Sequence, residues 1–121
     1  LTIGGVAIST GSHSLQIGQY SLNSGVVTFQ CRVEITSKES QSGIIEITGL
    51  PIPCNSTSQA VSVVPINTNT TSSGIYSQII ASTGRVAIQK GSTTSSSSNN
   101  LVDTEVFSTL SLKVSGSYFT N

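Results

Sequence analysis

The sequence predicts one all-β domain, built as a two-sheet antiparallel β-sandwich or jelly roll of about eight strands. Three observations support this prediction: apolar and polar residues alternate with a period of two, turn-forming residues interrupt the chain at short intervals, and no segment has a helical period. Strands with one apolar face need a second layer to cover it. A length of 121 residues suits one hydrophobic core, so we expect a single domain over residues 1–121.

The most regular strand covers residues 27–35. Its odd-numbered residues are all apolar and its even-numbered residues are all polar, which is typical of a strand with one buried face. Cys31 is therefore expected to point into the core beside Phe29. Shorter strands are expected at residues 6–8, 15–20, 44–47, 61–66, 76–80, 86–88 and 106–114, with turns at 23–25, 67–74, 82–84 and 91–100.

The sequence begins with Leu rather than Met. Residues 1–14 are therefore expected to be a linker or a first strand that continues from a missing upstream region. They lack the basic region and the apolar stretch of a signal peptide.

Composition argues against several classes of partner. Five Lys or Arg balance five Asp or Glu, so no net charge would draw the chain to nucleic acid or to an anionic membrane surface. No apolar run approaches the roughly 20 residues that span a bilayer. Ser and Thr supply 39 residues while charged residues make up 8%, so hydroxyl groups solvate this surface. We expect no nucleic-acid partner and no membrane insertion.

Groups that could carry out chemistry are scarce. His13 is the only imidazole and is expected to be exposed in a turn, Asp103 is the only aspartate, and no GxSxG motif occurs. Glu34 and Glu46 are expected to point outward from neighbouring strands, where Glu34 can pair with Arg32 or Lys113. We therefore expect no enzyme, with no catalytic residue, metal site or cofactor.

Two cysteines leave three alternatives open. Cys31 and Cys54 can form a disulfide, half of a metal site, or two buried thiols, of which the buried thiols are favoured because Cys packs as a small hydrophobe. The aromatic content is modest, with three Phe and three Tyr, and such a small core favours oligomerisation.

The order of three motifs resembles a module at the C-terminus of bacteriophage tail fibres and tailspikes. Tyr20 and the turn Asn23-Ser24-Gly25 lead into the long alternating strand, a short strand runs into Gly49-Leu50-Pro51, and the chain closes with Gly116-Ser117-Tyr118. The resemblance spans roughly residues 15–121 and departs from the commoner form at Ile52-Pro53-Cys54, which leaves the loop at Cys54 without an assigned role. It implies a jelly-roll sandwich that forms a three-fold homotrimer at the virion's fibre tip, outside the host cell. In some members it also implies contact with a bacterial surface polysaccharide.

Two sets of residues follow as candidates. An aromatic platform with amides and hydroxyls is typical of a sugar site. The ligand-binding candidates are Tyr76, Asn67, Asn69, Ser95, Ser96 and Asn99, and the trimer-interface candidates are Arg32, Glu34, Lys113, Tyr118 and Phe119. Two other functions stay open. One is a purely structural trimer clamp, and the other is an adhesin-like cell-surface sandwich in which Cys31 and Cys54 form a disulfide.

Overall fold

The computed structural model describes residues 1–68, 74–90 and 99–120. Its elements, in chain order, are β1 (Thr2–Ile3), β2 (Val6–Ala7), the 3₁₀ turn η1 (Thr10–Ser12), β3 (His13–Asn23), β4 (Val26–Ile35), β5 (Ile45–Thr48), β6 (Gln59–Thr68), β7 (Ile75–Ile79), β8 (Arg85–Lys90), β9 (Asn99–Asn100), the 3₁₀ turn η2 (Asp103–Glu105) and β10 (Val106–Phe119). The prediction of an all-β fold is confirmed.

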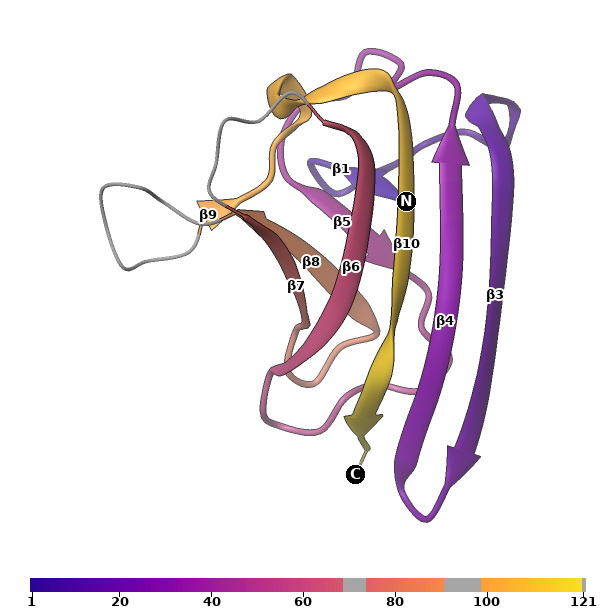
Figure 1. Ribbon diagram of the computed structural model, residues 1–121, viewed down its shortest axis with the longest axis vertical. Helices are drawn as coiled ribbons and strands as arrows, with labels where there is room; N and C mark the ends of the chain where they lie inside the picture. Colours follow the sequence, from indigo (N-terminus) through magenta and orange to yellow (C-terminus); the bar gives the residue numbers. More distant parts are fainter. Residues whose placement is uncertain (69–73, 91–98, 121) are drawn as a thin grey trace.

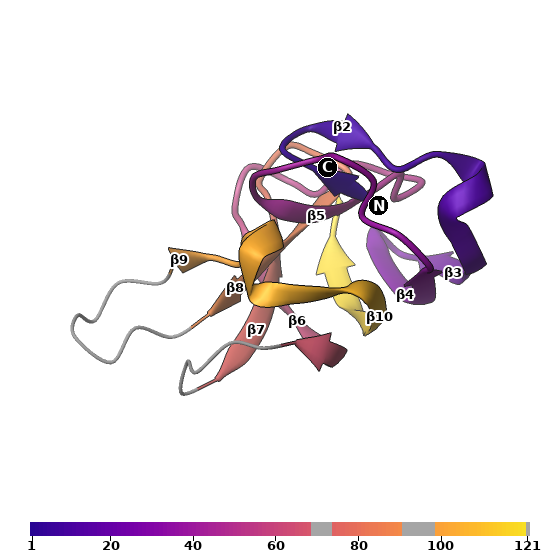
Figure 2. The same cartoon turned by 90° about the horizontal axis from the view of Figure 1, so that it is seen from above.

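All strand pairs are antiparallel, and together they form one sheet in the order β2-β1-β5-β8-β7-β6-β10-β4-β3, with β9 paired to β8. The sheet curls into a half-barrel. Figure 1 shows β3, β4, β10 and β6 side by side, which we call the front half, with β7, β8 and β5 crossing behind them. Figure 2 shows the same curl from above, with β3 and β4 on one side and β7, β8 and β9 on the other.

The sequence predicted two separate sheets, whereas the structure has one continuous sheet in which β6 links the front half to β7. Residues Gln59, Ala60 and Val61 of this strand pair with β7, whereas residues 62–66 pair with β10. One long strand therefore belongs to both halves. The sheet is continuous because β6 changes partners along its length instead of ending at a sheet boundary.

The number and length of the strands differ from the expectation. Ten strands are described instead of about eight, because β1 and β9 have only two residues each and carry no visible alternation. Strand β10 continues past residue 114 to Phe119, and β3 extends from His13 to Asn23. The turn between β3 and β4 is confirmed: Ser24 and Gly25 have φ of 50° and 78°, as a two-residue hairpin turn requires.

The core lies on the concave, inner face of the curled sheet. Cross-strand partners share a face, and the alternating residues of β4 meet Leu112, Val114 and Tyr118 of β10 there. The ring of Tyr118 packs edge-to-face on Phe29 with 5.7 Å between centroids. As predicted, Cys31 packs against this core, although it is only half-buried.

The Gly-Leu-Pro corner and the Cys54 loop are held by the end of β10. The hydroxyl of Tyr118 donates a hydrogen bond of 2.8 Å to the carbonyl of Ile52. Leu50 is partly buried against the core. The thiol of Cys54 is fully buried, and its backbone N–H donates to the carbonyl of Thr83. Cys54 thus packs as a small core side chain.

Gly116 of β10 packs closely against Val61 of β6. A Cβ atom on Gly116 would come within 2.9 Å of Val61 Cγ1 and 3.0 Å of Val61 Cβ. We predict that Gly116→Ala lowers the free energy of unfolding by about 1–3 kcal/mol, because the two strands must separate to admit the methyl group.

Chemical denaturation measures this effect, with Gly11→Ala as the control because a Cβ there meets no atom within 4 Å. Equal stability of the two variants would show that β10 and β6 are not in tight contact at this position.

Candidate functional site: a groove across the outer face of the front half

The convex, outer face of the front half carries two rows of side chains, which are polar except for Ile17. In one row Lys113 of β10 is the register partner of Arg32 of β4, which is in turn the partner of Ile17 of β3. The next row joins Ser115, Gln30 and Gln19 in the same way. Because register partners project to the same side, six side chains from three strands meet on one surface.

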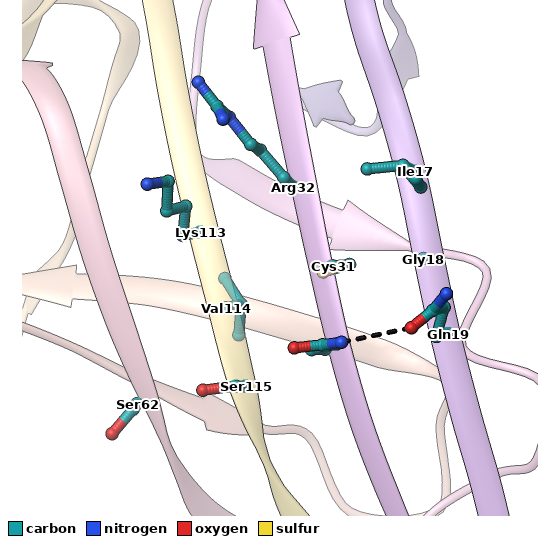
Figure 3. Close-up of a pocket in the computed structure, with 10 residues that line it drawn as sticks. Ile17, Gly18, Gln19, Cys31, Arg32, Ser62, Lys113, Val114 and Ser115 are labelled. Atoms are coloured by element: carbon teal, nitrogen blue, oxygen red, sulfur yellow. Dashed lines mark hydrogen bonds between the residues drawn. The ribbon is translucent and has the colours of Figure 1, made fainter.

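These rows line a groove, which we call the outer groove, with a volume of about 400 Å³. Figure 3 shows its side chains along β3, β4, β10 and β6. The lining consists of Ile17, Gly18, Gln19, Gln30, Cys31, Arg32, Ser62, Lys113, Val114 and Ser115. Its volume lies in the range of small-ligand sites.

Hydrogen bonds between neighbouring strands order the polar floor. The amide of Gln30 donates from Nε2 to Oε1 of Gln19 at 3.1 Å, drawn as a dashed line in Figure 3. Further along the same face, the hydroxyls of Thr28 and Ser117 are 2.9 Å apart. Both bonds lie at exposed positions, so their remaining donors and acceptors face solvent.

Charge gathers at one end of the outer groove. Arg32 donates from Nε and Nη2 to a carboxylate oxygen of Glu34, and Ser111 donates its hydroxyl to the same oxygen at 3.1 Å. These bonds, together with the nearby charge of Lys113, hold the pKa of the Glu34 carboxyl below its usual range. The side chain of Glu34 is 25% exposed and that of Arg32 is 43% exposed. Arg32 and Glu34 are therefore in contact, as the sequence suggested.

Glu46 does not share this surface. Strands β4 and β5 follow one another in the chain, but β4 pairs with β3 and β10, whereas β5 pairs with β1 and β8. The expectation that Glu34 and Glu46 sit on neighbouring strands is wrong. The buried carboxylate of Glu46 instead accepts a hydrogen bond of 3.3 Å from Arg85.

A second hollow, which we call the open hollow, lies between edge strand β3 and the corner after β5. Its volume is about 260 Å³, and its walls include Tyr20 and Gly18 on one side and Ile47 and Leu50 on the other. Tyr20 and Leu22 are register partners of Phe29 and Val27, so they lie on the inner face, yet they are 58% and 53% exposed. This hollow is the open side of the half-barrel.

The predicted sugar-binding residues are brought together only in part. Tyr76 of β7 is 40% exposed and is the register partner of Gln89, which is the partner of Asn100. Gln89 donates to the side chain of Asn100 at 3.4 Å. Asn99 of β9 is the register partner of Lys90, one position away from Asn100.

The other sugar-binding candidates lie at or beyond the edges of the described structure. Asn67 belongs to β6. Asn69, Ser95 and Ser96 lie outside the described residues.

The five interface candidates separate into three locations. Arg32, Glu34 and Lys113 lie at the charged end of the outer groove. Tyr118 is 1% exposed, so its side chain lies within the core of its own chain. Phe119 is 59% exposed at the end of β10 and is available to a partner.

His13 is less exposed than the sequence suggested. It begins β3 rather than lying in a turn, its Nδ1 lies 2.9 Å from the carbonyl oxygen of Ser9, and its Nε2 is enclosed without a hydrogen-bond partner among the described residues. In the described ranges no three His, Cys, Asp or Glu side chains gather as a metal site would require, and none of the helical turns is long and apolar enough to cross a membrane.

One of the two cysteines lies beside both hollows. Both cysteines are free thiols, and Cys31 borders the outer groove and the open hollow. Burial raises the pKa of the Cys31 thiol, which lowers its thiolate fraction at neutral pH.

Several residues of the outer groove were missed by sequence reasoning. Gln19, Gln30, Ser62 and Ser115 come from four strands, and their polar character was used only to identify the solvent face. The alternation that predicted the strand at 27–35 already placed Gln30 beside Arg32 on that face. The pairing of β4 with β10 could not be predicted, because β10 lies about 80 positions further along the chain.

The lowered pKa of Glu34 predicts a pH-dependent contribution to stability. A carboxyl with a depressed folded-state pKa stabilises the fold above its unfolded pKa of about 4.3, and this stabilisation is lost as pH falls through the folded value. We predict that Glu34→Gln lowers the melting temperature near neutral pH and that its difference from the wild type narrows as pH falls below about 4.

Thermal unfolding followed by circular dichroism across this pH range checks the prediction. Added salt should also narrow the difference, because the charges are partly exposed. A difference that stays constant with pH would mean that the Glu34 carboxylate contributes through packing rather than charge.

The comparisons with known proteins give no relative. No protein-family model, no curated protein and no solved structure matches this chain. The function of its surfaces therefore has to be derived from its own residues.

Proposed function

We propose that this chain is a non-catalytic module at the tip of a bacteriophage tail fibre or tailspike, where three copies assemble around a three-fold axis and contact a host surface polysaccharide. In this proposal the curled sheet is a jelly-roll sandwich whose front and back halves are the two layers. The motifs that suggested the family occupy structural positions: Gly49 turns the corner with φ of 89°, and Tyr118 ties β10 to the loop after that corner.

The observation that carries the proposal is the edge strand β3. It has eleven residues, pairs only with β4 among the described strands, and leaves the N–H and C=O groups of its other side without a neighbouring strand. Long uncovered edges with exposed apolar side chains are surfaces that soluble proteins usually protect. Tyr20 and Leu22 on this strand are more than half exposed, and Tyr20 lines the open hollow.

A second copy of the chain is the occupant that best explains this surface. Small all-β cores gain stability when symmetric copies bury apolar surface between them. Exposed Phe119 lies at the same end of the front half as the β3–β4 turn, since its register partner is Val26. Apolar side chains for an interface are thus present along β3 and at the end of β10.

Contact with a polysaccharide is supported by the row of Tyr76, Gln89 and Asn100. The exposed ring of Tyr76 and the exposed amide of Asn100, which the buried Gln89 holds through a hydrogen bond, supply the apolar and the hydrogen-bonding contacts that sugar rings accept. This row lies on β7, β8 and β9, at a distance in the sheet order from edge strand β3. Assembly through β3 therefore leaves it available.

The solution mass tests assembly most simply. We predict that the wild-type chain has the mass of three copies in sedimentation at micromolar concentration, and that Leu22→Glu shifts it to one copy because a charge replaces an apolar side chain at the interface.

Val6→Glu is the matched control, since Val6 is 49% exposed on β2 at the opposite edge of the sheet. A wild-type monomer at this concentration would overturn the trimer, and a trimer that survives Leu22→Glu would move the interface away from β3.

A further inference from the structure

The outer groove has a volume that suits one or two sugar rings. It crosses β3, β4, β10 and β6 and holds about 400 Å³. A further hollow shares Gln19, Gln30 and Ser115 with it and continues along the same strands. The groove can therefore accommodate a linear chain of sugars that runs along the strands.

Its polar groups suit the hydroxyls of a saccharide. The paired amides of Gln19 and Gln30 keep one another in place across two strands, which fixes their remaining donors and acceptors toward solvent. Ser115 is exposed beside them, and Ser62 adds a hydroxyl from β6. Ile17, 55% exposed, supplies an apolar wall against which the C–H face of a sugar can lie.

The charged side chains at one end of the outer groove favour a negatively charged ligand. Lys113 and Arg32 are direct register partners, so two cations face each other across β10 and β4. Such pairs are unfavourable unless a negative charge lies between them. Glu34 forms a salt bridge with Arg32, whereas Lys113 forms no salt bridge with the described residues. The cluster keeps a net charge of one positive unit at the rim of a groove that is otherwise neutral.

We propose that the outer groove binds a carboxylate-bearing saccharide, with the sugar carboxylate on Lys113 and its hydroxyls on Gln19, Gln30 and Ser115. This inference rests on the proposed contact with a host polysaccharide and assigns that contact an acidic sugar and a second surface. Assembly through the inner face and edge of β3 leaves the groove open, because its side chains project from the outer face.

Matched acidic and neutral sugars test the proposal. The probes are a trimer of galacturonic acid and its methyl ester, which has the same rings and hydroxyls without the charges. Isothermal titration at about 0.15 M salt should show the acid binding to the wild type about tenfold or more tightly than the ester. Lys113→Gln should remove that preference, and Lys113→Arg should retain it.

Two further variants locate the site. Ser115→Trp should block binding by filling the groove from an exposed position, whereas Lys90→Gln on β8 makes the same change of net charge outside the groove and should leave binding unchanged. Wild-type binding that does not distinguish the acid from the ester would overturn the proposal, as would an absence of binding to either probe.

A third outcome would also overturn the proposed binding in the outer groove. Loss of acid binding in Tyr76→Ala, with no loss in Lys113→Gln, would place the sugar on β7 instead and overturn the groove. Sedimentation of the same samples separates this failure from that of the proposed function: a trimer without acid binding contradicts only the groove, whereas a monomer contradicts the assembly.

Discussion

Gly116 of β10 approaches Val61 of β6 so closely that a side chain larger than hydrogen has no room there. At this point β6 stops pairing with β10 and begins to pair with β7. The close approach allows the sheet to bend sharply without ending, so that one continuous sheet encloses its own core. The front and back halves, and all surfaces they present, depend on this bend.

The bend also determines which surfaces stay uncovered. A sheet that curls without closing keeps two edges, β2 and the much longer β3, whose exposed Tyr20 lines the open hollow. The convex side of the same strands carries the opposite character: ordered amides, hydroxyls and a pair of cations. A strand alternates its two faces, so β3 can contribute to an assembly interface on one side and to a ligand groove on the other.

Local sequence patterns predicted the strands and turns that depend on residues adjacent in the chain. Alternation identified β4, and Ser24-Gly25 identified its turn, because both signals come from residues next to one another. Pairings between distant segments were not predictable: Glu46 meets Arg85 across 39 positions, and Arg32 meets Lys113 only because β10 returns beside β4. The candidate groove joins four strands and has no spacing in the sequence that would reveal it.

Amide hydrogen exchange along β3, in the wild type and in Leu22→Glu, tests directly whether copies of this chain meet at edge strand β3. We expect slow exchange in β4 and β10 for both proteins, since these strands are paired on both sides. If copies meet at β3, its amides that do not face β4 exchange slowly in the wild type and quickly in the variant. Equally fast exchange of these amides in both proteins would mean that the copies do not meet at β3.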